Sequence, residues 1–236
     1  MTALLQIEGL EAFYGASQIL HGIDLQVARG EQVALIGRNG MGKTTLLRTL
    51  MGLVPGSRGK RSFHGRDIAR AAPEAIARAG LALVPEGRGI FGSLSVTENL
   101  VMAAREGPDG RRTWTLPRIF ELFPRLHQRR NNGGHQLSGG EQQMLTIGRA
   151  LMTNPDMILI DEATEGLAPL VAQDIWKTLG VIRNEGIATL VVDKDFSSLS
   201  RIADRMVMLS KGSVVFDGSP AALAAQPDLL ERHLGV

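Results

Sequence analysis

Short runs of consecutive apolar residues recur along the chain, separated by segments whose apolar residues follow helical spacing. The clearest runs cover residues 33–36, 81–84, 157–160 and 188–192. A continuous apolar run of four or five residues is typical of a strand that is buried on both faces. Strands of this kind alternating with helices predict an α/β fold with a largely parallel sheet.

The N-terminal part of the chain shows a different pattern. Residues 3–8 alternate weakly between apolar and polar, and residues 23–27 alternate cleanly. Strict alternation predicts a strand with one solvated face, as in antiparallel sheets. Together with residues 32–36, these segments predict an antiparallel β edge that leads into the first buried strand.

A helical section interrupts the α/β pattern. Ser95 and Glu98 have the spacing of a capping box, which predicts a helix start, and helical spacing continues toward residue 150. We therefore expect residues 90–150 to form an α-helical subdomain, inserted into an α/β core built from residues 1–89 and 151–236.

The loop after the first buried strand carries the strongest chemical signal. Gly37, Gly42, Lys43 and Thr44 match the pattern Gly-x-x-x-x-Gly-Lys-Ser/Thr between a predicted strand and a predicted helix. Glycines let successive backbone N–H groups point into one concavity, and the helix N-terminus adds unpaired donors and a positive dipole end. The lysine supplies a charge to the β- and γ-phosphates, and the threonine hydroxyl can ligate Mg²⁺. The loop is predicted to bind a nucleoside triphosphate.

Acidic residues follow two of the other buried strands. Asp161 and Glu162 end the strand at 157–160, and Glu86 lies in a glycine-rich loop after the strand at 81–84. In phosphate-binding ATPases of this kind, an acid at the first position helps to hold Mg²⁺, and a second acid can accept a proton from attacking water. A cluster that caps a helix N-terminus is the alternative, and the phosphate-binding loop upstream favours the catalytic interpretation.

Composition excludes several classes of protein. The chain has 236 residues, of which 44% are hydrophobic and 21% charged, as expected for one globular domain or a domain with a subdomain. The net charge is +2 and the 26 basic residues form no long run, so nothing indicates binding to nucleic acid. The absence of cysteine fits a reducing compartment. No apolar run approaches 18 residues, so we expect no membrane span.

The segment Leu137-Ser138-Gly139-Gly140-Glu141 lies between the phosphate-binding loop and the acidic pair. In this order, the three motifs resemble those of ABC-type ATPases over nearly the whole chain. The resemblance implies that two copies associate head to tail, with each ATP between the phosphate-binding loop of one and the signature of the other. The signature residues expected to contact the partner's ATP are Ser138, Gly139, Gly140 and Glu141.

Four further segments narrow the resemblance, at residues 84–91, 121–126, 140–145 and 165–169. They are similar to the shorter of the two ATPase subunits of bacterial branched-chain amino-acid importers. This implies an ATP hydrolase at the cytoplasmic face of the inner membrane. Its implied partners are transmembrane permeases, a second ATPase subunit in a homo- or heterodimer and, indirectly, a solute-binding protein. An importer of urea or short amides, a soluble ABC ATPase and a non-hydrolysing ATP-binding module remain alternatives.

The resemblance also assigns roles within the site, with ATP and Mg²⁺ as cofactors. Tyr14, whose default role as a turn residue is packing, stacks on adenine in this assignment. Glu86 stands where most ABC ATPases have a glutamine that contacts Mg²⁺ and signals to the permease, and Glu162 is the general base. Glu165 opens a loop that contacts the other subunit. The expected ATP-binding residues are Tyr14, Gly37, Arg38, Asn39, Gly40, Met41, Gly42, Lys43, Thr44 and Thr45, and the expected metal ligands are Thr44, Glu86 and Asp161.

Lys194 is the main departure from the family pattern. ABC ATPases usually carry a histidine here, which contacts the γ-phosphate, and relatives of this subunit type often have glutamine. Lysine can donate to a phosphate but does not shuttle a proton near neutral pH unless its pKa is lowered. Lys194 therefore binds the γ-phosphate, impairs its own site, or is a solvent-exposed residue without a role. Met41 and Ala163 are smaller departures in backbone-dominated positions, where we expect little effect.

Overall fold

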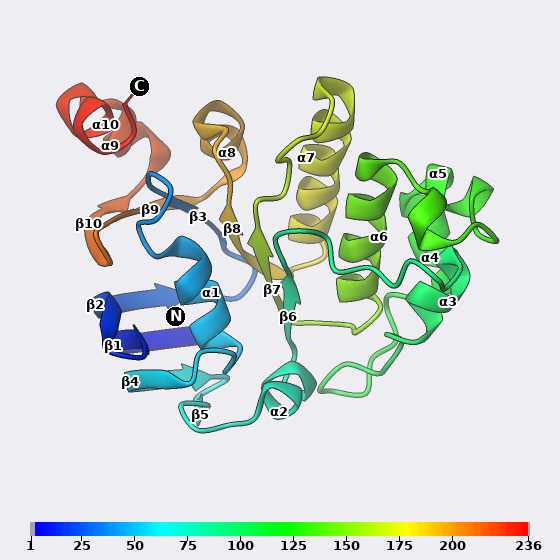
Figure 1. Ribbon diagram of the computed structural model, residues 1–236, viewed down its shortest axis with the longest axis horizontal. Helices are drawn as coiled ribbons and strands as arrows, with labels where there is room; N and C mark the ends of the chain where they lie inside the picture. The colour runs from blue at the N-terminus through cyan, green and yellow to red at the C-terminus, as the bar shows by residue number, and fades with distance from the viewer. Residues whose placement is uncertain (1–2, 236) are drawn as a thin grey trace.

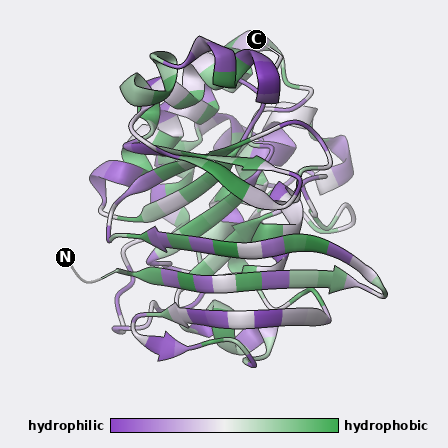
Figure 2. Ribbon diagram, turned by 90° about the vertical axis from the view of Figure 1, so that its left-hand side faces the viewer, coloured by the Kyte–Doolittle hydropathy of each residue, from purple (hydrophilic) through white to green (hydrophobic). Residues whose placement is uncertain are grey.

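The computed structural model describes residues 3–235 and contains two β-sheets that lie next to each other (Figure 1). The smaller sheet is antiparallel and has the strand order β2-β1-β4-β5. Its strands are β1 (Leu5–Tyr14), β2 (Ser17–Val27), β4 (Gly56–Phe63) and β5 (Arg66–Asp67). Figure 2 shows hydrophobic and hydrophilic residues alternating along its strands, as expected for a sheet with one buried face.

The larger sheet has the order β10-β9-β3-β8-β7-β6. Strands β3, β6, β7, β8 and β9 run parallel to one another, and β10 is antiparallel to β9. The strands are β3 (Gln32–Ile36), β6 (Leu81–Val84), β7 (Met157–Asp161), β8 (Ala188–Val192), β9 (Arg205–Ser210) and β10 (Ser213–Gly218). This confirms the predicted α/β fold class with its largely parallel sheet.

The antiparallel strands differ from the expectation in one respect. They form a sheet of their own and are not an edge of the sheet that contains β3. Both edges of β3 are already occupied, by β8 on one side and β9 on the other. Strand β2 therefore pairs with β1 and packs against the face of the larger sheet.

Helices lie on both faces of the larger sheet, and α3, α4 and α5 lie farther out, beyond α6 (Figure 1). They are α1 (Lys43–Leu50), α2 (Pro73–Arg78), α3 (Val96–Val101), α4 (Leu116–Leu122), α5 (Pro124–Gln128), α6 (Gly139–Leu151), α7 (Pro169–Asn184), α8 (Phe196–Ile202), α9 (Pro220–Ala224) and α10 (Pro227–His233). Within the predicted helical section, residues 116–128 form two helices, because Pro124 has no N–H to donate and disfavours helical backbone at Phe123. Within residues 3–235, no helix is long and apolar enough to cross a membrane.

Two apolar clusters lie on the two faces of the larger sheet. Val33 and Leu35 of β3 belong to the cluster that includes the antiparallel sheet and α1, whereas Ala34 and Ile36 belong to the cluster that includes α6 and α7. Side chains of a strand alternate between faces, so a strand covered on both sides must be apolar throughout. This packing accounts for the continuous apolar runs, and it brings the carboxyl ends of β3, β6, β7 and β8 to one edge of the sheet.

Candidate nucleotide-binding site

The loop between β3 and α1 depends on glycine at two positions. Gly37 has φ 145°, and a Cβ there would lie 2.4 Å from the carbonyl oxygen of Leu209. Gly42 has φ 99°, and a Cβ there would lie 2.9 Å from a methyl carbon of Leu20. Gly42 is also the N-cap of α1, and no side chain in the described residues caps this helix. Its first backbone N–H groups are therefore available to an anion at the positive end of the helix dipole.

Lys43 extends back over this loop. Its Nζ donates hydrogen bonds to the carbonyl oxygens of Gly37 at 2.7 Å and of Arg38 at 2.9 Å. The residue is buried, and burial lowers its pKa, while the nearby Asp161 carboxylate acts in the opposite direction. The ammonium group is thus held in front of the N-terminus of α1, where it can bind phosphate oxygens.

The carboxyl end of β7 faces this loop. The Thr44 hydroxyl donates a hydrogen bond of 3.2 Å to Oδ1 of Asp161, which is buried. Burial raises the pKa of Asp161, and the negative charge of Glu86 raises it further. A hydroxyl and two carboxylates are the hard oxygen ligands that Mg²⁺ prefers, so these three residues fit the expected metal.

Glu162 follows Asp161 in a left-handed backbone conformation, with φ 53°. Its N–H donates to the carbonyl oxygen of Val192 at 2.9 Å. Its side-chain oxygen Oε2 is buried and has no hydrogen-bond partner in the described residues. A non-glycine residue held in this region costs conformational energy, and such positions cluster at active sites.

A cavity of about 400 Å³ brings these groups together. Nine of the ten residues that line it were predicted for the site from sequence: Tyr14, Asn39, Gly40, Gly42, Lys43, Thr44, Thr45, Glu86 and Glu162. The tenth is Ile19 of β2, which carries no sequence signal beyond apolar alternation. Three other predicted residues, Gly37, Arg38 and Met41, are not among the lining residues. The carbonyl oxygens of Gly37 and Arg38 accept from Lys43, and Met41 Sδ accepts from the backbone N–H of Lys211.

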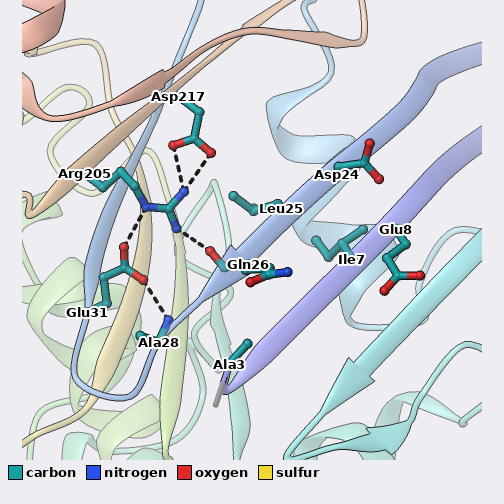
Figure 3. Close-up of a pocket in the computed structure, with 10 residues that line it drawn as sticks. All are labelled: Ala3, Ile7, Glu8, Asp24, Leu25, Gln26, Ala28, Glu31, Arg205 and Asp217. Atoms are coloured by element: carbon teal, nitrogen blue, oxygen red, sulfur yellow. Dashed lines mark hydrogen bonds and ion pairs between the residues drawn. The ribbon is translucent and has the colours of Figure 1, made fainter. Parts of the chain in front are cut away.

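A larger cavity of about 580 Å³ lies where the antiparallel sheet meets β9 and β10 (Figure 3). Figure 3 shows Arg205 bound to Glu31, Asp217 and the backbone oxygen of Gln26. Because these acceptors engage its guanidinium, Arg205 joins the strands and does not offer a phosphate-binding group.

The signature residues lie outside the nucleotide cavity of their own chain. Ser138 is the N-cap of α6: its Oγ accepts from the backbone N–H of Glu141, and the Glu141 carboxylate accepts from both the Oγ and the N–H of Ser138. The Ser-x-x-Glu spacing that reveals this capping box was visible in the sequence, although we used it only for Ser95 and Glu98. A Cβ at Gly139 would meet the guanidinium of Arg88, and one at Gly140 would meet Val171.

Comparison with known proteins agrees with this geometry. The sequence pattern of the ABC transporter family matches residues 20–165. The chain is 38% identical to the high-affinity branched-chain amino acid transport ATP-binding protein BraG of Pseudomonas aeruginosa, over 98% of this chain and 100% of the relative. It is 34% identical to the lipopolysaccharide export system ATP-binding protein LptB of Acidithiobacillus ferridurans, over 100% and 98%.

A solved structure of an ATP-binding cassette of an ABC transporter, in its ADP conformation, matches with a TM-score of 0.82. The identity is 25%, over 98% of both chains. The chain belongs to the ABC transporter family. It is an ATP-hydrolysing subunit that binds nucleotide and energises a transporter. ABC subunits of this kind work with transmembrane permeases and dimerise.

Lys194, the residue that departs from the ABC pattern, lies just beyond β8. Its Nζ forms an ion pair with Glu165 and lies 3.8 Å from Oε2 of Glu162. The hydrogen bond that Lys194 donates to Glu165 is the largest influence that raises the pKa of Lys194. The structure thus places Lys194 beside the predicted general base. The sequence did not indicate that Glu165 would hold it there.

Proposed function

We propose that this chain is the ATPase subunit of a bacterial importer for branched-chain amino acids. The proposal rests on one geometric observation: Lys43, Thr44, Asp161 and Glu162, from distant parts of the chain, surround one cavity or contact its lining. The likeness to BraG over the whole length of both chains supports the finer assignment of the solute class.

Each residue at the cavity has a role in this proposal. Lys43 and the N–H groups at the start of α1 bind the phosphates, and the half-exposed Tyr14 ring stacks on adenine. Thr44, Glu86 and Asp161 hold Mg²⁺, which would neutralise charge on the phosphates when bound. The carboxylate of Glu162, which lines the cavity and whose oxygen Oε2 accepts no hydrogen bond within residues 3–235, accepts the proton of the attacking water.

The signature residues serve the ATP of a second subunit. Ser138 and the amides of Gly139 and Gly140 start α6 but lie outside their own chain's cavity, which supports a head-to-tail pair. Whether the second subunit is identical or a sister ATPase is left open in this proposal. Residues 90–150, which contain α3–α5 and all of α6 except its last residue, form the helical subdomain of each subunit.

The proposal places the chain at the cytoplasmic face of the inner membrane, bound to permeases. A groove of about 330 Å³, lined by residues of β6, α6 and the loop after β6, supports this placement. Phe91, Val101 and Met102 are exposed near this groove, at 45%, 51% and 53%. Exposed apolar side chains gathered at one place are typical of a protein interface. A solute-binding protein would deliver the solute to the permeases and not to this chain.

The relative in lipopolysaccharide export makes export the competing class. Transport measured in vesicles separates the two. The complex is purified from detergent-solubilised membranes of the host through this chain and reconstituted with its solute-binding protein. We expect two multi-spanning permeases, a second ATPase subunit, and ATP hydrolysis stimulated by leucine, isoleucine or valine. Stimulation by urea or a short amide, or recovery of an export permease, would contradict the solute assignment. Recovery of soluble partners alone would contradict the transport assignment.

A Glu162→Gln variant tests the catalytic assignment in the purified chain. Glutamine keeps the shape of the side chain but cannot accept the proton of water. We expect turnover to fall by about 100-fold or more while ATP still binds. Glu121→Gln is the matched control, because Glu121 lies exposed on α4 and forms no ion pair within residues 3–235. Hydrolysis at near the wild-type rate in Glu162→Gln would remove the general-base assignment.

A further inference from the structure

The loops that follow β7 and β8, at the carboxyl edge of the larger sheet, are connected by successive hydrogen bonds. The N–H of Glu162 donates to the carbonyl oxygen of Val192 at 2.9 Å. The N–H and the hydroxyl of Thr164 both donate to Oδ2 of the buried Asp193 at 2.8 Å. The next residues along each loop, Glu165 and Lys194, then form their ion pair. The position of Lys194 beside Glu162 is therefore built by three successive contacts.

Carboxylates crowd the position where the Lys194 ammonium lies. Glu86, Glu162 and Glu165 each offer an oxygen, and these oxygens lie within 4.8 Å of one another. Like charges at this separation repel, and a cation among them offsets the repulsion. Lys194 supplies that cation, bound to Glu165 and 3.8 Å from Glu162. Its pKa is raised by Glu165, so it stays charged near neutral pH and acts as a cation and hydrogen-bond donor only.

The same ammonium lies beside the nucleotide cavity, 3.8 Å from an oxygen of Glu162, which lines that cavity. Burial is the main cause that lowers the pKa of Lys43, and the positive charge of Lys194 contributes in the same direction. Lys43 lines the nucleotide cavity, and Glu162 lines it beside Lys194. A terminal phosphate between Lys43 and Glu162 would be a second acceptor for the Lys194 ammonium, because phosphate, like carboxylate, accepts charge-assisted hydrogen bonds.

We propose that Glu165 is a positioning residue for Lys194, and that Glu165 and the terminal phosphate of ATP compete for its ammonium group. The proposal rests on the proposed ATP site. Glu165 holds Lys194 next to the general base, and the γ-phosphate draws it away while Asp193 and Thr164 keep the two loops together. ADP, which lacks the γ-phosphate, leaves the pair between Glu165 and Lys194 in place. The chain thereby distinguishes ATP from ADP partly through this exchange.

Equilibrium binding of two nucleotides to the purified full chain tests the exchange. The ligands are Mg²⁺ with the β,γ-imido analogue of ATP, which is not hydrolysed, and Mg²⁺ with ADP. The variants are Glu165→Gln, Lys194→Gln and the double variant, with Glu121→Gln as the control. We expect Glu165→Gln to tighten binding of the triphosphate analogue by roughly two- to fivefold, because the analogue no longer has to break one exposed ion pair. The affinity for ADP should not change. In the Lys194→Gln background, Glu165→Gln should have no effect on either ligand.

The outcomes separate this inference from the function on which it rests. Tightening that is specific to the triphosphate and disappears without Lys194 supports the exchange. The exchange would be overturned if neither affinity changed, if both changed equally, or if the same tightening occurred in the Lys194→Gln background. Unchanged ADP affinity also shows that the variant is folded. If the wild-type chain bound neither nucleotide, the proposed ATP site itself would be wrong.

Discussion

Two helix N-termini in this molecule are suited to phosphate, and they are constructed differently. Helix α1 begins after Gly42, with no side-chain cap and no acidic residue in its first turn. Helix α6 begins after Ser138, with a complete capping box and Glu141 in its first turn. The first helix therefore leaves its N–H groups and its dipole available, whereas the second satisfies them within the chain.

The difference indicates how each terminus meets its ligand. At α1, the ammonium of Lys43 and the uncapped amides present positive charge to a phosphate. At α6, the Ser138 hydroxyl donates to the Glu141 carboxylate within the chain. In the proposed head-to-tail pair, the α1 site would bind nucleotide within one chain, whereas the phosphate of a partner's ATP would have to displace the Glu141 carboxylate at α6. The two termini are thus suited to different roles: α1 to binding nucleotide, and α6 to pairing with a second subunit.

The largest expected effect comes from removing the charge at α1. Lys43→Met keeps the length and apolar stem of the side chain but removes the ammonium. Because charged hydrogen bonds contribute about 1.5–3 kcal/mol each, we expect ATP affinity to fall by about 10- to 100-fold. Titration of the purified variant with ATP measures this, and Lys60→Met on the exposed face of β4 is the control. Equal affinities in Lys43→Met and wild type would refute the assignment of α1 as the primary phosphate site.

The next effect concerns the backbone that holds α1 in position. Gly37→Ala places a Cβ against the carbonyl oxygen of Leu209 in a conformation that alanine rarely adopts. We expect the free energy of unfolding to fall by about 2 kcal/mol or more, measured by urea denaturation. Gly40→Ala is the matched control, since Gly40 also has positive φ but nothing within 4 Å of a Cβ. A loss of stability no larger than in the control would show that the close approach to Leu209 is not limiting.

Two serines with the same capping chemistry separate stability from ligand binding. Ser95 caps α3 and Ser138 caps α6, each with a complete box. Substitution of either by alanine should lower the free energy of unfolding by about 1 kcal/mol. Only Ser138→Ala should also reduce ATP turnover of the assembled transporter. If Ser95→Ala reduced turnover equally, the effect at α6 would be one of stability alone.

The smallest expected effect is a pH dependence of stability at the capping box formed by Ser95 and Glu98. Hydrogen bonds from the side chain and N–H of Ser95 lower the pKa of Glu98 below its ordinary value. The ionised carboxylate therefore stabilises the fold above the unfolded-state pKa of about 4.3, and this contribution is lost as pH falls through the folded-state pKa. The thermal midpoint of the wild type should exceed that of Glu98→Gln near neutral pH, with the difference shrinking below about pH 4. A constant difference across this range would exclude the carboxylate as its origin.

Local patterns in the sequence predicted most of the elements and most of the site. Buried strands are apolar throughout because they have no solvated face, so β3, β6, β7 and β8 were recognised within one residue of their bounds. The phosphate-binding loop was recognised because its glycines, lysine and threonine must occur at fixed spacing for one backbone turn to bind a phosphate. Nine of the ten cavity residues followed from these motifs and from the resemblance.

Only the tertiary structure decided which surfaces meet. The sequence contained the alternating strands but did not show that β8 and β9 occupy both edges of β3, which forces β1 and β2 into a separate sheet. Likewise, Glu165 and Lys194 are 29 residues apart and carry no shared motif. Their pairing follows from parallel strands β7 and β8 ending side by side. Sequence determines local geometry because backbone preferences act over a few residues, whereas contacts between distant segments depend on how whole elements pack.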